Sequence, residues 1–500
     1  MEPTIESARK DRRLRALFFA LALLYVIPFW VVGHVPTVDG PCHTYNAWVL
    51  HQYGNVERYP LFQQYYEISA KPYPNWIGQA VMALLMYAVP PVAAEKLLVS
   101  GYALLFLAGA WYLVGAVRPE ERWLAFLAFP FVCHQLFQFG FYNFAISVAF
   151  FLLGVGFWWR HRDRPGDLRF AVGINLLLWL CYFSHILSLG LALVAISVLW
   201  LATLRRETWR RHLLHVAILL PQAVLPLWFF VTQGGGRMPS TWPLAQMARF
   251  LVRLEVLVTL NVEQLWLTVP LALLFLFLLL VTLGRGGLWR PESAFLLLAP
   301  LFIVLYFVSP DGAAGGWLLK NRLSLYPYLI LLPGLSPRLG RRGAALATGV
   351  LTLAALGNLG YLIQGYRGLG AEVDGFLAGL EPVAPNSREL TLLFERTWPT
   401  DVLSHATGYV ALEKGLIDWD NYEAKTSYFS VRFRDSVEFP EMAGVPVTPG
   451  SYRVRPNVRR VDAVYLWRMP LGHPLGTRLR RHYMLTREDG EGMLFERGGG

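Results

Sequence analysis

The feature that most constrains this chain is the alternation of long apolar runs with short clusters of arginine and lysine. An apolar run of about 20 residues is long enough to cross a bilayer as a helix, and basic residues gather in loops on the cytoplasmic side. Charged residues make up only 16% of the chain, against roughly a quarter in soluble domains. The net charge of +11 therefore indicates membrane topology and not nucleic-acid binding. This pattern predicts a polytopic α-helical membrane protein.

The basic clusters set the predicted topology, because each should lie in the cytoplasm. They fall at residues 118–122, 160–169, 205–212, 285–290 and 338–342. The first apolar run, residues 17–33, is followed by no small-residue cleavage site, so we expect an uncleaved span with residues 1–16 in the cytoplasm. Only one crossing then fits before residue 118. The run 91–117 crosses, and the run 75–90 lies in the interface or re-enters from the outside.

Each later interval between basic clusters must hold an even number of spans, which gives about eleven transmembrane helices in all. The expected spans are two within residues 123–158, two within 170–204, two flanking the polar loop 232–262, a pair at 293–308 and 323–336, and a last one at 344–363. The transmembrane domain is thus residues 17–363, with an external loop at 34–90.

Residues 364–500 have a higher charge density and are predicted to form an extracytoplasmic α/β domain. Apolar stretches bounded by turn residues predict strands, and a helical stretch ended by glycine predicts a helix stop. The expected elements are strands at 389–394 and 461–467, a hairpin of 483–487 with 492–497, and a helix at 401–414.

Asp39 opens the external loop in the sequence Asp39-Gly40-Pro41-Cys42-His43-Thr44-Tyr45-Asn46. An Asp-Gly-Pro turn leading into a helical pattern places Asp39 at a helix N-terminus, with His43 about one turn further on. The alternative is a hydrated turn that the Asp39 side chain merely caps. An acidic residue and a histidine at a membrane surface make this stretch the first candidate site.

The topology places further polar residues on the same external side, namely His134, Asn143 and His185. Polar residues at membrane depth are costly and indicate function by default. The alternative for His134 and His185 is that they cap helix ends and face water at the turn.

Several basic residues also fall on the external side, against the positive-inside pattern. They are Lys320 and Arg322, beside Asp311, and Arg237, Arg249 and Arg253 in the loop 232–262. Snorkelling explains some such residues. A cationic cluster near an acidic site also suits an anionic lipid head group, because Arg and Lys hold phosphate oxygens by charge-assisted hydrogen bonds.

Other site classes have no support in the sequence. Cys42, Cys133 and Cys181 lack metal-type spacing and are too few for a disulfide framework, although a bridge between Cys133 and Cys181 is one alternative. There is no Walker motif, no nucleotide-binding glycine pattern, no Ser-His-Asp signature and no internal repeat.

The arrangement resembles the GT-C class of integral membrane glycosyltransferases, which includes protein O-mannosyltransferases and aminoarabinose transferases. The resemblance rests on a first span, a long external loop that opens with an acidic motif, many further spans and a C-terminal extracytoplasmic domain. It also rests on the acidic motif itself and on three short segments: Lys71-Pro72-Tyr73-Pro74-Asn75-Trp76, Phe139-Gly140-Phe141-Tyr142-Asn143-Phe144 and Lys320-Asn321-Arg322-Leu323.

The resemblance implies transfer of a sugar from a polyprenyl-phosphate donor, a membrane lipid, to an extracytoplasmic glycan, lipid or protein acceptor, in the inner membrane of a bacterium. Asp39 would be the catalytic base, with His43 orienting the acceptor. A divalent metal, Mg or Mn, would be bound by Asp39 and His43 if by any residues, since the chain has Asp-Gly-Pro where the best-studied members have Asp-Glu or Asp-x-Asp. The lipid phosphate would be held by Lys320, Arg322 and Arg237, and the acceptor or donor by His134, Asn143, His185 and Tyr45.

Two other classes stay open at this point. One is a transporter or flippase of a lipid-linked or anionic solute, which needs polar residues near mid-depth in several spans; residues 264–284 and 344–363 are almost free of them. The other is a non-catalytic subunit of an envelope assembly complex.

Overall fold

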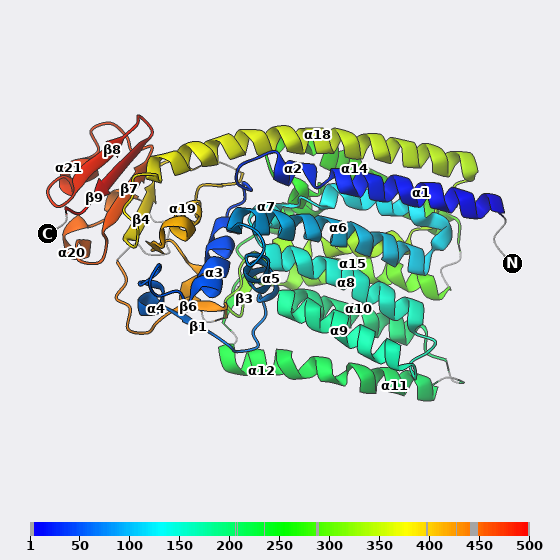
Figure 1. Cartoon of the computed structure of the whole chain (residues 1–500). Coiled ribbons are helices and arrows are strands. Elements are labelled where there is room, and N and C mark those ends of the chain that lie inside the picture. Colours follow the sequence, from blue (N-terminus) through cyan, green and yellow to red (C-terminus); the bar gives the residue numbers. More distant parts are fainter. Residues whose placement is uncertain are drawn as a thin grey trace. The chain divides into compact units, whose positions relative to one another are not determined.

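The chain forms two compact units in a computed structural model (Figure 1). The first unit comprises residues 1–28, 100–137 and 143–363, and the second comprises residues 29–99, 138–142 and 364–500. The structure describes residues 5–205, 207, 209–234, 236–286, 290–396, 399–426, 428–440 and 449–498. Because the second unit includes residues 29–99, the predicted external loop packs with the C-terminal segment.

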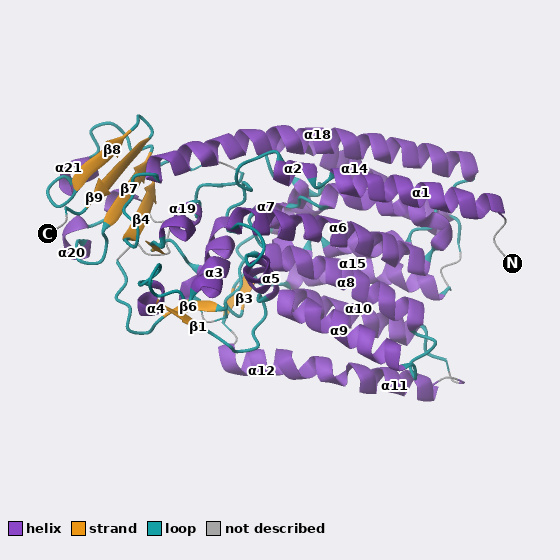
Figure 2. Ribbon diagram, in the orientation of Figure 1, coloured by secondary structure: helices purple, strands orange, loops and turns teal. Residues whose placement is uncertain are grey.

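Helices dominate the first unit (Figure 2), and many of them are apolar. Its longer helices are α1 (Ile5–Leu24), α6 (Pro91–Val117, whose first residues belong to the second unit), α8 (Tyr142–His161), α9 (Leu168–Ser184), α10 (Ile186–Ala202), α11 (Trp209–Leu219), α12 (Val224–Gln233), α14 (Leu265–Gly284), α15 (Ala294–Val308) and α18 (Arg341–Leu380, whose last residues, from 364 on, belong to the second unit). Asp167 caps α9 by accepting a hydrogen bond from the Arg169 amide. This N-cap begins α9 at the polar connection that follows α8.

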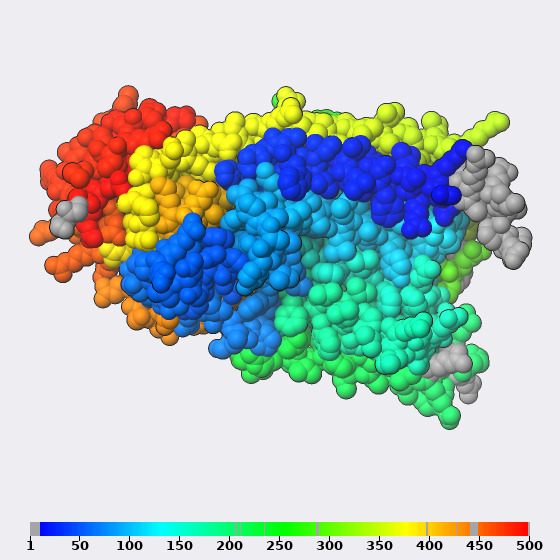
Figure 3. All heavy atoms as spheres, viewed as in Figure 1, coloured from blue at the N-terminus to red at the C-terminus, as the bar shows by residue number. Residues whose placement is uncertain are grey.

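Within the described residues, seven helical segments are long and apolar enough to cross a membrane. They are Asp11–Trp30, Pro91–Val117, Tyr142–His161, His212–Gln233, Val262–Gly284, Pro291–Val308 and Arg341–Leu380, and α9 and α10 are shorter apolar helices. The helices α9 to α12 form one exposed surface of the first unit (Figure 3). Leu168, Leu227 and Val231 there are 75%, 64% and 83% exposed. Large apolar side chains exposed in this way indicate a membrane protein.

Two of the expected pairs of spans have a different local structure. Residues 119–131 form a 3-10 helix, η1 (Pro119–Phe131), with Pro130 inside it, and only α8 fills the rest of the interval 123–158 as a long helix. The expected span 323–336 is divided into α17 (Tyr326–Leu331) and η7 (Leu332–Gly334), with Pro333 in the second. Proline removes a backbone donor and interrupts regular helix. The count of eleven spans stays a prediction.

The second unit is built on a five-stranded sheet of order β5-β4-β7-β9-β8 (Figure 2). Its strands are β4 (Arg388–Leu393), β5 (Ile417–Asp418), β7 (Ala463–Trp467), β8 (Met484–Glu488) and β9 (Gly492–Glu496). β4 is parallel to β5 and β7, whereas β9 is antiparallel to β7 and β8. All five residues of β7 are buried, while the edge strand β8 alternates exposed and half-buried residues. The predictions of both strands and of the closing hairpin are confirmed.

The loop between the first two apolar runs supplies the remaining elements of this unit. They are α3 (Gly40–Gln52), α4 (Phe62–Tyr65), β1 (Tyr66–Ile68) and α5 (Ile77–Leu85). β1 pairs antiparallel with β6 (Val431–Phe433), so the loop and the C-terminal segment share a small sheet. α5 has nine residues, too few to cross a bilayer, which agrees with the prediction that the run 75–90 does not span.

One sequence expectation is wrong in its bounds, and one alternative is contradicted. The predicted helix 401–414 is α19 (Thr407–Lys414), and residues 402–406 form turns in which Ser404 donates a hydrogen bond to Asp401 Oδ2 at 2.8 Å. Such local side-chain bonds compete with helix. Among the described residues Cys42, Cys133 and Cys181 form no disulfide, so the alternative of a bridge between Cys133 and Cys181 is contradicted.

Candidate active site around Asp39

Asp39 lies at the N-terminus of α3, as the sequence predicted. Its backbone N–H donates to the carbonyl of Phe139 at 3.1 Å, and the N–H of Val38 donates to the carbonyl of Gln138 at 3.2 Å. Gly140 makes this close pairing feasible, because it has φ +81° and a Cβ there would lie 2.5 Å from the Asp39 nitrogen. The Asp39 side chain makes no capping hydrogen bond to its own helix. The alternative in which Asp39 merely caps the turn is therefore wrong.

The Asp39 carboxylate faces side chains from the C-terminal segment. Tyr422 donates its hydroxyl hydrogen to Asp39 Oδ2 at 2.6 Å. His405 Nε2 lies 3.6 Å from Asp39 Oδ1, and His405 Nδ1 contacts Asp420 Oδ2 at 2.9 Å. The side chains of Asp39, His405 and Asp420 are 8%, 11% and 14% exposed. An imidazole thus stands between two nearly buried carboxylates.

This arrangement makes His405 a cation at neutral pH. Burial lowers the pKa of His405, but the charges of Asp420 and Asp39 outweigh it and raise the pKa to about 10. Burial raises the pKa of Asp39, and the His405 charge and the Tyr422 hydrogen bond oppose that rise. The His405 cation therefore favours the ionised form of Asp39, the form that accepts a proton.

His43 belongs to a second buried pair. Its Nδ1 lies 2.7 Å from Glu423 Oε1, a close ionic contact. Glu423 Oε2 accepts hydrogen bonds from Asn46 at 2.9 Å and from Gln79 at 2.7 Å. Burial lowers the pKa of His43, but the contact with Glu423 and the charges of Glu423, Asp39 and Glu95 together outweigh burial and raise it. Since Glu423 is fully buried, His43 and the two amides are the groups that make its burial tolerable.

A third buried carboxylate lies beneath the Asp-Gly-Pro turn. Glu95 accepts hydrogen bonds from the hydroxyls of Tyr142 and Tyr409, both at 2.7 Å, and Tyr142 also contacts Thr37 at 2.7 Å. Gly40 fits against this group, because a Cβ would lie 2.3 Å from the Tyr142 hydroxyl. The glycine of the motif is thus required by packing.

Tyr45, predicted to contact acceptor or donor, points into the core of the same unit. Its hydroxyl donates to the carbonyl of Leu416 at 2.5 Å and lies 3.2 Å from the Tyr66 hydroxyl. The predicted site residues are divided between the two units. The second unit contains Asp39, His43 and Tyr45, and the first unit contains His134, Asn143, His185, Lys320, Arg322 and Arg237.

In the first unit the structure brings two of the predicted residues together. The Arg322 guanidinium donates to His185 Nε2, and it lies 5.4 Å from the centre of the Phe144 ring. His185 also caps α10, since its Nδ1 accepts from the Leu187 amide. His185 therefore caps a helix end, as the alternative stated, but it also contacts Arg322 and does not only face water. His134 accepts from the Phe137 amide at 3.0 Å and is fully buried, so it does not face water.

The other predicted cations have separate partners. Lys320 donates to the carbonyl of Ser309 and lines a cavity of about 120 Å³ with Asp311. Arg249 and Arg253 lie 3.4 Å and 3.6 Å from Glu255. Arg237 is exposed on the short strand β2 (Arg237–Met238). Asn143 is buried near the start of α8.

His405, Asp420, Tyr422 and Glu423 are the residues that sequence reasoning missed. Three of them lie in one segment, Asp418-Trp419-Asp420-Asn421-Tyr422-Glu423, where acidic and aromatic residues follow the short strand β5. This concentration of acidic and aromatic residues was the one feature of the sequence that could have indicated a site there. Nothing in the spacing links it to Asp39, which precedes it by almost 400 residues.

The expected divalent metal stays a prediction. Within the part of the chain that the structure describes, no group of three or more His, Cys, Asp and Glu side chains is arranged to hold one. The two residues proposed as ligands are also engaged elsewhere, Asp39 with Tyr422 and His405, and His43 with Glu423.

Comparison with known proteins adds no relative. No protein family, curated protein or solved structure matches this chain.

Proposed function

We propose that this protein is a membrane glycosyltransferase that moves a sugar from a polyprenyl-phosphate donor to an extracytoplasmic acceptor, with Asp39 as the catalytic base. The observation that carries the proposal is the placement of Asp39. Its carboxylate is nearly buried at a helix N-terminus and faces the His405 cation at 3.6 Å. A nearly buried carboxylate whose ionised form is favoured by a neighbouring cation can accept a proton from a hydroxyl.

The chemistry assigns a task to each group. Asp39 takes the proton of the acceptor hydroxyl, and the acceptor oxygen attacks the anomeric carbon of the donor sugar. The bond from that carbon to the phosphate oxygen breaks, and its electron pair leaves with the polyprenyl phosphate. Cations near the departing phosphate stabilise its charge, and Lys320, Arg322 and Arg237 are proposed for this role.

The proposal includes the finer topology. Eleven spans, a cytoplasmic N-terminus and an extracytoplasmic C-terminal domain in a bacterial inner membrane would put Asp39 on the side where the donor's sugar is presented. The seven apolar helices support a membrane location, and the shared strands β1 and β6 support placing the loop 34–90 and residues 364–500 on one side.

The test is transfer of labelled sugar from polyprenyl-phosphate donors by the purified protein. We expect Asp39→Asn to lower turnover by about 10²-fold to 10⁴-fold, the usual size of a general-base contribution, with unchanged membrane expression. Asp435→Asn is the matched control, because Asp435 is an exposed carboxylate in the same unit. A chelator added to the wild type tests the metal.

Activity of Asp39→Asn close to the wild-type value would remove Asp39 from the catalytic role. A folded wild type that transfers no sugar from any donor, but moves a lipid-linked or anionic solute across proteoliposomes, would favour the transporter instead.

A further inference from the structure

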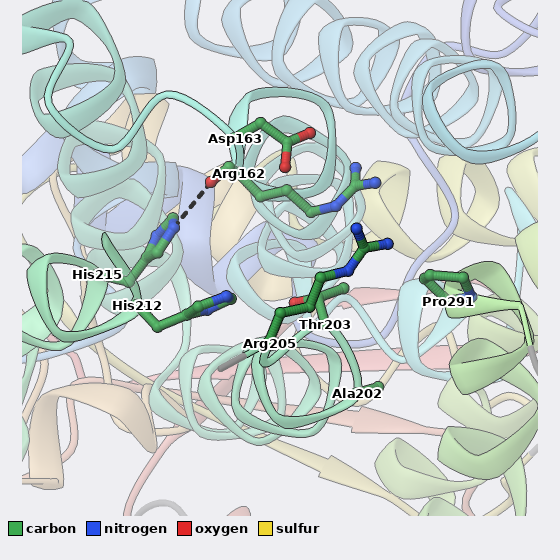
Figure 4. Close-up of a pocket in the computed structure, with 8 residues that line it drawn as sticks. All are labelled: Arg162, Asp163, Ala202, Thr203, Arg205, His212, His215 and Pro291. Carbon is green, nitrogen blue, oxygen red and sulfur yellow. Dashed lines mark hydrogen bonds between the residues drawn. The ribbon is translucent and has the colours of Figure 1, made fainter. Parts of the chain in front are cut away.

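A basic pocket of about 320 Å³ lies in the first unit, where the ends of α8, α10 and α11 meet (Figure 4). Arg162 and Asp163 follow the end of α8, Arg205 follows α10, and His212 and His215 lie on α11. Both arginines belong to clusters that the sequence analysis assigned to the cytoplasmic side. None of these residues has a role in the proposed transfer.

The two arginines extend into the same space. In Figure 4 the guanidinium groups of Arg162 and Arg205 point toward each other, and the His212 ring points toward them from α11. Arg162 is held in place by a hydrogen bond to the Trp159 carbonyl and by the Trp159 ring, 3.9 Å from its guanidinium carbon. Burial and the charge of Arg205 lower the pKa of Arg162, and the carboxylates of Asp163 and Glu292 oppose this. The lining therefore places two guanidiniums and two imidazoles beside a single carboxylate, that of Asp163.

Buried polar atoms at this pocket lack partners. His215 is 2% exposed and its Nε2 contacts the Arg162 carbonyl at 2.9 Å. The Nδ1 atoms of His215 and His212 are buried without a hydrogen-bond partner among the described residues. Buried polar groups of this kind are normally satisfied by protein, water or ligand. An anion that accepts hydrogen bonds could pair with these imidazoles and with the guanidiniums that line the same pocket.

An apolar groove of about 830 Å³ begins at the same place. Ala202 and Pro291 line both the basic pocket and this groove, which runs between α14 and α15. Its lining on α14 extends from Val269 to Leu283, a distance of about 21 Å at about 1.5 Å per helical residue. That covers roughly two thirds of a hydrocarbon core about 30 Å thick. The groove therefore has the length and character of a site for a lipid chain.

We propose that the pocket and groove together bind an anionic phospholipid, with its phosphate between Arg162 and Arg205 and one chain along α14 and α15. Arg pairs suit phosphate oxygens because their donors match them in bidentate geometry, and basic pockets between transmembrane helices bind anionic head groups. Free phosphate shares the head-group chemistry, but it would leave the adjoining groove without a role. Continuity with the groove is what favours a lipid. The site is distinct in its residues from the one proposed for the donor phosphate.

The experiment is native mass spectrometry of the full-length protein with phosphatidylglycerol or phosphatidylcholine of identical chains. The wild type should retain phosphatidylglycerol preferentially. The double variant Arg162→Gln, Arg205→Gln should bind it roughly 30-fold more weakly, since each surface cation contributes roughly a factor of five. Arg164→Gln is the matched control, because Arg164 is an exposed cation of the same connection that does not line the pocket; its binding should be unchanged.

Two further arms separate the sources of phosphate. Ala272→Phe narrows the groove on α14 and should weaken phosphatidylglycerol binding, while millimolar inorganic phosphate should not displace the lipid. Equal retention of both lipids by the wild type, or an unchanged preference in the double variant, would overturn the proposal. Displacement by inorganic phosphate together with an unaffected Ala272→Phe variant would overturn the lipid assignment in favour of a soluble phosphate.

Discussion

Replacing His405 by glutamine should reveal whether its charge keeps Asp39 ionised. His405 Nε2 and Asp39 Oδ1 are 3.6 Å apart, so Coulomb's law gives about 1 kcal/mol in bulk water and about 5 kcal/mol at an effective dielectric constant of about 20. At about 1.4 kcal/mol per tenfold change in proton affinity, losing the cation should move the acid limb of the activity profile up by about 1 to 3 pH units.

The sign follows from the charge that is lost. Burial already raises the pKa of Asp39, and His405 opposes it. Without that cation the carboxyl group stays protonated to a higher pH, so less of the base form is present at a given pH, and the lost activity returns as the pH rises. Since the pKa of His405 is raised to about 10, the wild type keeps the cation across the neutral range.

The assay is kcat/KM for sugar transfer measured from pH 5 to pH 9, because this ratio reports the pKa values of the free enzyme's essential groups. His405→Lys retains a positive charge and should restore part of the wild-type profile. His482→Gln, at an exposed histidine of the same unit, should leave the profile unchanged. A uniform loss of activity in His405→Gln with no movement of the acid limb would refute the electrostatic role and leave a structural one.

Two further substitutions test the packing of the site. Gly140→Ala should lower the free energy of unfolding by about 1 to 3 kcal/mol, because φ is +81° and the new Cβ would lie 2.5 Å from the facing backbone. Gly54→Ala is the control, because a Cβ at Gly54 meets nothing within 4 Å. Equal melting temperatures for the two variants would contradict this prediction. Glu423→Ala should cost about 3 to 5 kcal/mol in chemical unfolding, because the buried His43 loses its partner, while Glu438→Ala at an exposed carboxylate should cost far less. A Glu423→Ala variant as stable as Glu438→Ala would show that the pair contributes nothing.

Much of the local structure follows from sequence pattern. The Asp-Gly-Pro turn and α3, the strands β4 and β7 and the closing hairpin all depend on neighbours in the chain, which is why turn residues and periodicity predicted them. The helices are apolar over many residues, so composition alone predicts a membrane protein. Where prolines interrupt apolar runs, as at Pro130 and Pro333, hydrophobicity overestimated the continuous helix.

The partners of Asp39 could not be predicted in this way. The side chains that contact Asp39 and its partner come from the turn before α19 and the segment after β5, and they are His405, Asp420 and Tyr422. They reach Asp39 only because the C-terminal segment packs on the loop 34–90 within one unit. Residues 401–406 were expected to be part of a helix, and nothing in that expectation pointed to the contacts of His405 with Asp39 and Asp420. Long-range polar contacts leave no periodic trace in a single sequence.

The sequence by itself predicted a helical membrane protein and drew attention to Asp39 and His43. It could do so because the length of the apolar runs, the basic clusters and the Asp-Gly-Pro turn each depend on residues that are close together in the chain. Only the tertiary structure decided that Asp39 faces a histidine cation and that His43 faces Glu423. It also placed the basic pocket at the end of an apolar groove. The physical reason is that burial and charge at a site depend on residues hundreds of positions apart, which only the folded chain brings within a few ångströms.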